Sequence, residues 1–189
     1  MGIIITQEDF KLIGQLATHC DKEKLNMAIE EALMFDVEPL LCSMFIEIEA
    51  NWSSTDEIWV DLINGSNYEN CNEKKRRQAG VKSMILYYAY ARYVVLNNFN
   101  DTPNGAVTKT NQFSIPKPLK EIEQFANKYR SMGYKVYKDV EDFMCINKDD
   151  YTEFNDYNCA SCGCGDTCKE GTKAKGFGIK PKNVSRWDV

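Results

Sequence analysis

The segment from Ser83 to Leu96 constrains the fold of this chain more than any other. Its one charged residue is Arg92, and it carries four of the ten tyrosines. A helix that is apolar on nearly every face has to be covered by other helices or by neighbouring subunits. We therefore predict a mainly α fold, a helical bundle around a long central helix from about Asn72 to Asn98. At about 1.5 Å per residue, that helix would be about 40 Å long.

Capping residues and apolar spacing predict shorter helices before the central one. Thr6 and Asp9 are placed to cap a first helix, and Asp21 a second. The apolar residues of the second helix recur on one face and form its buried stripe: Leu25, Ala28, Ile29, Ala32 and Leu33.

Two more short helices are expected before the central one. Pro39 cannot continue the second helix, because it lacks an amide proton and clashes with the preceding turn. We expect it to begin a short helix that runs through Ile48. The stretch Ser53–Asp56 then caps a further helix, which ends at Asn64–Asn67.

The chain after the central helix changes character twice. We predict a turn at Thr102–Gly105 and an extended segment at residues 106–115, with no obvious core partner. Pro116 and Pro118 then open a last helix. Its apolar or small residues follow each other at steps of three and four, as in a heptad seam: Leu119, Ile122, Ala126, Tyr129, Gly133, Val136, Val140 and Phe143. Such a seam suits either the core of a bundle or a contact between subunits.

Composition divides the chain into a helical domain, residues 1–150, and an extended C-terminal arm, residues 151–189. The arm is poor in Leu and Ile and rich in Gly, Lys, Asn and Asp. Residues 1–64 carry three lysines against thirteen acidic residues, whereas residues 169–189 carry six basic residues against two acidic ones. The acidic head and the basic tail could attract each other, within one subunit or between copies, or each could simply be solvated.

The chain shows no sign of a membrane or secretory segment. The longest apolar run is shorter than the about 20 residues that a membrane span needs. The apolar start, Met1–Ile5, is too short for a signal sequence. We therefore expect a protein that is made and kept in the cytoplasm, where its eight cysteines serve as thiols or metal ligands rather than disulfides.

Four cysteines lie within ten residues of the arm, at Cys159, Cys162, Cys164 and Cys168. Four thiolates can hold a zinc ion in a tetrahedron, and the glycines between them permit tight bends. A structural zinc site that stiffens the arm is one interpretation. Reduced thiols, disulfides formed in air and an iron–sulfur cluster are the others, because the spacing differs from that of the usual zinc-binding pairs.

Catalysis finds little support in the sequence. His19 is the single histidine, which argues against a histidine-dependent triad or a site with several histidine ligands. Neither a phosphate-binding loop nor a dinucleotide fingerprint is present, and we do not expect an enzyme. The basic cluster Lys74–Arg77, expected to open the central helix, could meet phosphates or an acidic neighbouring subunit.

Several short motifs resemble the head–tail connector, or neck adaptor, proteins of tailed bacteriophages, most closely those of crAss-like phages. The resemblance runs from about Ile4 to Lys109. It is carried by these segments: Ile5–Lys11, Lys24–Ala32, Pro39–Cys42, Leu62–Gly65, Gln78–Lys82, Tyr87–Tyr93 and Thr102–Lys109. The family commonly has glycine where this chain has Cys42, and the cysteine cluster is not part of the pattern.

The resemblance implies a virion structural protein. Its copies, typically twelve, would form a ring between the portal and the tail, with a channel through which DNA passes without specific binding. The segment Val107–Ile115 would add to a sheet of another chain or clasp the portal, and no membrane would be involved. The alternative is a small zinc-binding regulatory or nucleic-acid-binding protein, with the cysteine cluster as its active part.

Overall fold

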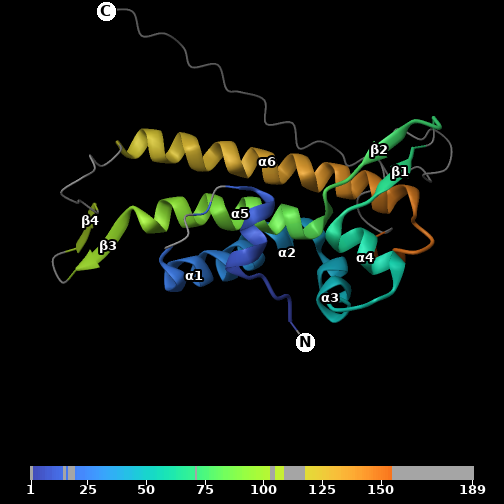
Figure 1. Cartoon of the computed structure of the whole chain (residues 1–189), viewed down its shortest axis with the longest axis horizontal. Coiled ribbons are helices and arrows are strands. Elements are labelled where there is room, and N and C mark those ends of the chain that lie inside the picture. The colour runs from blue at the N-terminus through green and yellow to red at the C-terminus, as the bar shows by residue number, and fades with distance from the viewer. Residues whose placement is uncertain are drawn as a thin grey trace, which may run out of the picture.

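The computed structural model describes residues 2–14, 16, 20–70, 72–102, 105–108 and 118–154. This part of the chain is mainly α-helical, as predicted (Figure 1). The α-helices are α1 (Lys22–Ala32), α2 (Glu38–Leu41), α3 (Ser43–Ala50), α4 (Glu57–Asn64), α5 (Gly80–Asn97) and α6 (Leu119–Ile146). The strands are β1 (Asn67–Glu69), β2 (Lys75–Arg77), β3 (Phe99–Thr102) and β4 (Gly105–Thr108). Shorter helical turns are the 3₁₀ segments η1 (Gln7–Leu12) and η3 (Thr152–Phe154) and the π segment η2 (Leu33–Val37).

The predicted caps at Asp21 and Asp56 are confirmed, whereas Thr6 precedes only the short 3₁₀ segment η1. The amide of Lys24 donates to the Asp21 carboxylate at 3.2 Å at the start of α1. The amide of Ile58 donates to the Asp56 carboxylate at 3.2 Å at the start of α4. The stripe of α1 is buried at Leu25, Ala28, Ile29 and Ala32.

The helix expected from Pro39 through Ile48 is interrupted. Pro39 lies in the first turn of α2, as predicted, because that position needs no amide donor. The chain then breaks at Cys42, whose φ of 50° and ψ of −128° lie outside the helical region, and α3 starts anew. The prediction of one continuous helix was wrong at this point.

The central helix is α5, but it begins at Gly80 and not at Asn72. Residues 75–77 instead form β2, which pairs antiparallel with β1 in the register Asn67↔Arg77 and Glu69↔Lys75. The Asn70 side chain accepts the amides of Asn72 and Lys74 at 3.1 and 3.0 Å, which closes a turn in place of a helical one. With 18 residues, α5 is about 27 Å long.

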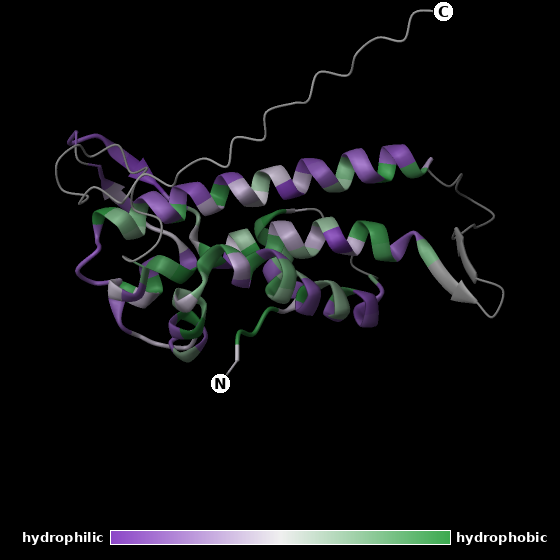
Figure 2. Ribbon diagram, turned by 180° about the vertical axis from the view of Figure 1, so that it is seen from behind, coloured by the Kyte–Doolittle hydropathy of each residue, from purple (hydrophilic) through white to green (hydrophobic). Residues whose placement is uncertain are grey.

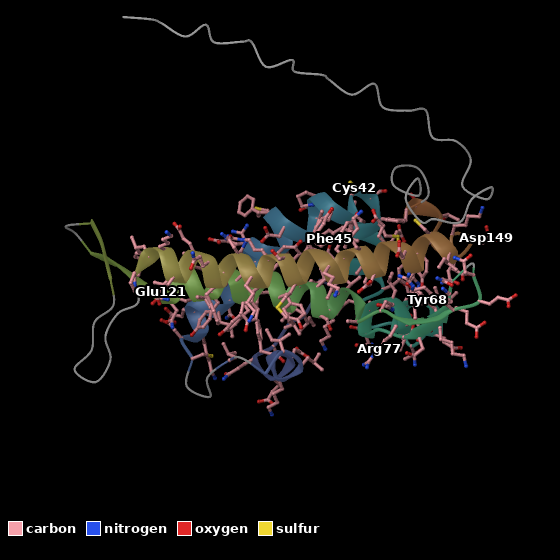
Figure 3. All side chains as sticks on the ribbon, turned by 90° about the horizontal axis from the view of Figure 1, so that it is seen from above. Cys42, Phe45, Tyr68, Arg77, Glu121 and Asp149 are labelled. Carbon is pink, nitrogen blue, oxygen red and sulfur yellow. The ribbon has the colours of Figure 1, made fainter. Side chains whose placement is uncertain are left out.

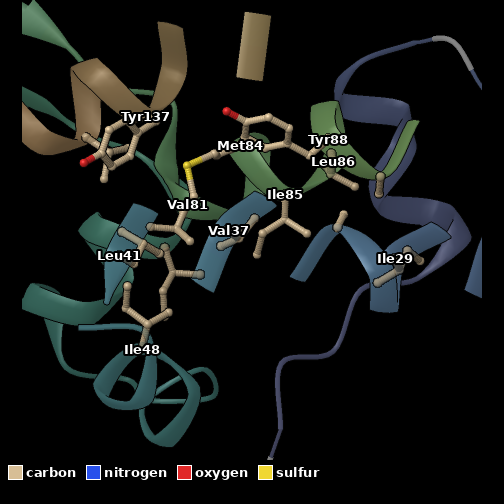
Figure 4. Close-up of a cluster of buried hydrophobic side chains, with 14 of the residues drawn as sticks. Ile29, Val37, Leu41, Ile48, Val81, Met84, Ile85, Leu86, Tyr88 and Tyr137 are labelled. Carbon is tan, nitrogen blue, oxygen red and sulfur yellow. The ribbon is translucent and has the colours of Figure 1, made fainter. Parts of the chain in front are cut away.

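The chain itself covers α5, which packs against α1, α4 and α6 (Figure 1). Figure 4 shows its Val81, Met84 and Ile85 meeting Val37 and Leu41 from the segment before α3. Val81, Met84, Ile85 and Leu86 are fully buried. No second subunit is therefore needed to cover the apolar surface of this helix.

The seam of α6 faces this core, so the core interpretation is confirmed over the intersubunit one. Tyr129 packs edge-on against Tyr90, with ring centroids 4.7 Å apart. A Cβ on Gly133 would lie 3.1 Å from the Tyr88 ring, so glycine lets α5 and α6 approach closely. Leu119 departs from the predicted seam and is 54% exposed.

The predicted extended segment begins as β4, and its partner is β3 of the same chain. The two strands form an antiparallel hairpin in which Phe99 pairs with Thr108 and Thr102 with Gly105. The Lys24 ammonium donates to the Phe99 carbonyl and ties the hairpin to α1. Residues 109–115, the rest of the predicted segment, lie outside the described residues.

The two hairpins project from opposite ends of the helical body (Figure 1). Residues 151–154, which composition placed in the arm, pack on the helices instead: the Tyr151 hydroxyl donates to the Ile58 carbonyl at 2.8 Å, and Phe154 is buried. In the described part of the chain, no helix has the length and apolar character needed to cross a membrane.

Candidate interaction surfaces

The predicted metal ligands Cys159, Cys162, Cys164 and Cys168 lie outside the described residues, as does His19. Across the residues that the structure describes, no three His, Cys, Asp or Glu side chains are grouped to hold a metal ion. The zinc site therefore stays a prediction for the arm. The surfaces built by the helical body are described below.

The base of the β1–β2 hairpin is a close crossing of two chain segments. Gly65 ends α4 with φ 94°, and Gly80 starts α5 with φ 84°. A Cβ on Gly80 would lie 2.4 Å from the Ile63 carbonyl oxygen, and one on Gly65 would lie 2.7 Å from the Gln78 carbonyl oxygen. Only glycine permits both the backbone angles and the contact, so the crossing fixes where the hairpin leaves the body.

Gln78 closes this crossing from inside and is fully buried. Its Nε2 donates to the Asp61 carbonyl at 2.5 Å, and its Oε1 accepts the Gly80 amide at 2.5 Å. The side chain thus connects the end of α4 to the start of α5 and gives the buried Gly80 amide its acceptor, while the Asp61 carbonyl also accepts the Gly65 amide at 2.9 Å. Nothing in the sequence distinguishes Gln78 from an exposed glutamine, and its role was not predicted.

A second set of contacts holds the hairpin against the end of α6. The Tyr68 ring packs edge-on against Phe143 at 5.4 Å, and burial raises the pKa of its hydroxyl. Arg76 reaches Asp142 across 3.8 Å. Burial raises the pKa of the Asp142 carboxyl, and the Arg76 charge opposes that rise.

The other face of the hairpin is open. We call Lys74, Lys75, Arg77, Asn67 and Glu69 the hairpin face; all five side chains are exposed. An open groove of about 640 Å³ follows the two strands and is lined by side chains of both faces, Tyr68 and Arg76 included. Figure 2 shows the hairpin as one of the most hydrophilic parts of the ribbon. Its ammonium and guanidinium groups can pair with carboxylates or phosphates.

A surface of opposite charge lies on α2, α3 and α4. From Leu25 to Glu73 the sequence has eleven acidic residues and no lysine or arginine. We call the acidic side chains of these three helices and of the α4 cap, which are exposed or partly exposed, the acidic layer: Glu38, Glu47, Glu49, Asp56, Glu57 and Asp61. No ion pair within the described residues involves any of them.

Arg92, the one charge in the predicted apolar run, is paired inside the chain. Its Nε donates to Asp36 at 2.5 Å and an Nη to Glu31 at 3.0 Å. The hydrogen bond that Arg92 donates to Asp36 is the main reason that the Arg92 pKa is raised. The pair holds η2 against α5 and leaves Met34 and Phe35 exposed at 58% and 60%.

Asp9 ties the N-terminal turn to the start of α5. Its carboxylate accepts the Thr6 amide at 2.7 Å and lies 2.6 Å from the Lys82 ammonium. Burial by itself would raise the Asp9 pKa, but the bonds from Lys82 and Thr6 outweigh it, and the pKa is lowered from its usual 3.8.

The segments that carry the phage resemblance therefore meet one another inside the body. Asp9 meets Lys82, the Leu62–Gly65 segment meets Gln78–Gly80, and Arg92 meets Glu31. Each contact stabilises the fold and none of them assembles a nucleophile with a base. The surfaces open to a partner are the hairpin face and the acidic layer, at the same end of the body, where Figure 3 labels Tyr68, Arg77 and Asp149.

Comparison with known proteins gives one family. No curated protein and no solved structure matches the chain. A family model covers residues 37–164, more than half of the chain, and includes the hairpin, both long helices and three of the four clustered cysteines. The chain belongs to DUF6712, a family of unknown function.

Proposed function

We propose that this protein is a virion structural protein, a head–tail connector of a tailed bacteriophage. Its copies, twelve in the typical case, form a ring between portal and tail and surround a channel for DNA. The proposal rests on the resemblance of residues 4–109 to neck adaptors. It places the protein in the virion neck after synthesis in the host cytoplasm.

One observation carries the proposal further: a helical core with a hairpin at each end, neither of which pairs with a third strand among the described residues (Figure 1). Two-stranded hairpins have free edges and are marginal alone, so they gain stability when another chain covers them. Contact elements at both ends suit a subunit that joins one layer of an assembly to the next. A net charge of −5 suits a channel wall past which DNA slides without binding.

The test is assembly with the neighbouring virion component. The full chain, alone and mixed with the portal protein of the same genome, is examined by light scattering and by negative-stain microscopy. We expect a ring whose mass is about twelve times the 21.7 kDa of one chain, and its capture by the portal. A chain that stays monomeric with portal present would refute the proposal.

The second candidate is a zinc-binding regulatory or nucleic-acid-binding protein. The exposed basic strand Lys75–Arg77 favours it, together with the cysteines at 159, 162, 164 and 168. This candidate requires stoichiometric zinc and salt-sensitive DNA binding that is lost on chelation. Zinc without DNA binding would leave the connector proposal intact, with the cluster as a structural clip.

A further inference from the structure

We propose that the hairpin face of one copy docks on the acidic layer of a second copy of this chain. The inference rests on the proposed ring and names the contact that would build it. Because the two surfaces differ, the contact is heterologous, and repetition from copy to copy closes a ring when the rotation permits.

The hairpin is anchored to the body at its base and through its other face. Side chains of a strand alternate between the two faces of the sheet, so Arg76 points opposite to Lys75 and Arg77. Arg76 is held at Asp142, and Tyr68, its cross-strand partner, packs on Phe143. The crossing at Gly65 and Gly80 fixes the base of the hairpin. A partner that binds Lys75 and Arg77 therefore need not order the strands first.

The acidic layer offers the complementary charge and some apolar area. Its carboxylates have no lysine or arginine between Leu25 and Glu73 to neutralise them. Ile46, which directly precedes Glu47 on α3, is 65% exposed, and Val60 on α4 is 37% exposed. Apolar side chains beside charged ones are what a protein partner can bury and a polyphosphate cannot.

A protein partner suits the hairpin face better than DNA does. Glu69 lies directly across from Lys75 in the ladder, and Glu73 follows in the turn. The acidic layer at the same end of the body would repel a phosphate backbone. The carboxylates of a second copy are separate groups, so they can pair with Lys75 and Arg77 and stay away from Glu69 and Glu73.

Charge reversal on each surface tests the contact in the full chain. The hairpin variant is Lys75→Glu with Arg77→Glu, and the layer variant is Glu47→Lys with Glu57→Lys. We expect each to weaken assembly at least about tenfold in apparent Kd. The four changes combined in one chain, or the two variants mixed, restore complementary pairs, and assembly should return. Circular dichroism checks that each variant is folded.

The matched control is Lys120→Glu with Lys128→Glu, the same charge change on exposed positions of α6. It should assemble as the wild type does. Raising the salt concentration should dissociate the wild-type assembly, because salt screens the exposed charges of the contact.

Other results would overturn the inference in distinguishable ways. Rings that form unchanged from both variants refute this contact and leave the connector proposal standing. If the hairpin variant assembles normally but loses a salt-sensitive binding of DNA that the wild type shows, the hairpin face is a nucleic-acid surface. An arm variant, Lys173→Glu with Lys175→Glu, tests the basic arm as the other occupant. If this variant and the layer variant both fail to assemble while the hairpin variant assembles, the arm and not the hairpin face binds the acidic layer. A wild type that stays monomeric with portal refutes both proposals.

Discussion

The start of α5 and the start of α3 make the same demand on the backbone and meet it with different residues. Gly80 has φ 84°, and Cys42 has φ 50°. Positive φ favours glycine at both places, since a Cβ crowds the following carbonyl. Gly80 lies against the Ile63 carbonyl oxygen, which a Cβ would approach to 2.4 Å, whereas Cys42 is exposed.

The difference shows that packing, and not the dihedral angle alone, dictates glycine at position 80. Backbone strain at an exposed site lowers the free energy of unfolding but does not displace neighbouring residues. A Cβ at the crossing of α4 and α5 would also push two backbones apart and move the β1–β2 hairpin with them. The start of α5 is therefore the part of the body that positions the proposed docking surface.

Of the substitutions that test this difference, Gly80→Ala should lower the stability of the fold most. Strain at positive φ and the overlap with Ile63 together predict a loss of about 3–5 kcal/mol in the free energy of unfolding. Urea denaturation measures it. Gly14→Ala is the matched control, since Gly14 has φ 65° but no atom within 4 Å of its Cβ position. The control should lose only about 1 kcal/mol. Equal losses would mean that φ, and not the crossing, decides.

Gln78→Ala should come next. It removes the acceptor of the buried Gly80 amide and one of two donors to the part-buried Asp61 carbonyl, which keeps the Gly65 amide. The unsatisfied buried amide costs about 1–3 kcal/mol, and we expect a loss of about 2 kcal/mol. Thermal unfolding checks this value. Gln124→Ala, on the exposed side of α6, should change stability by less than about 0.5 kcal/mol.

Asp9→Asn tests the tie between η1 and α5 through pH. The folded-state pKa of Asp9 lies below its usual 3.8, so its carboxylate stabilises the fold above pH 3.8. That stabilisation disappears as the pH falls through the lowered value. The wild type should exceed Asp9→Asn by about 1 kcal/mol at pH 7, and the two should converge in acid. Asp149→Asn, at an exposed position, serves as the control; a difference independent of pH would contradict the prediction.

Cys42→Gly should have the smallest effect and the opposite sign. Glycine removes the strain at φ 50° and ψ −128°, partly offset by its greater freedom in the unfolded chain. We expect a gain of about 0.5–1 kcal/mol in the free energy of unfolding, measured by thermal unfolding. Cys42→Ala keeps the Cβ and should show no gain. A gain from alanine would assign the effect to the thiol instead.

The sequence predicted local structure well where short-range chemistry decides it. Asp21 and Asp56 each begin a helix, because a carboxylate that accepts a free amide is a local event. The seam from Ile122 to Phe143 is buried except at Val136, which is partly buried, because its spacing follows one face of a single helix. The prediction of a helix failed at residues 72–79. Lysine and arginine have high helix propensity, but the turn at Asn70 and the pairing of β2 with β1 favour a strand there.

The candidate surfaces were only half predictable. The basic cluster Lys74–Arg77 was expected to open the central helix, but Lys75–Arg77 form a strand, and the division into a held face and an open face depends on the strand register. Gln78 gave no signal, because burial of a polar residue depends on partners 17 positions away in the chain. The cysteine cluster lies beyond Phe154, where the structure describes no residues.

By itself, the sequence determined a mainly α fold around an apolar tyrosine-rich helix, its helix caps and the uneven distribution of charge. These features depend mainly on neighbours within a few positions, or on composition, so they can be predicted without knowledge of the rest of the fold. Tertiary structure alone decided that α1, α4 and α6 cover that helix, that Gly65 and Gly80 cross, and that Lys75 and Arg77 face outward. Each of these depends on contacts between residues far apart in the chain, whose energy appears only when the whole body packs.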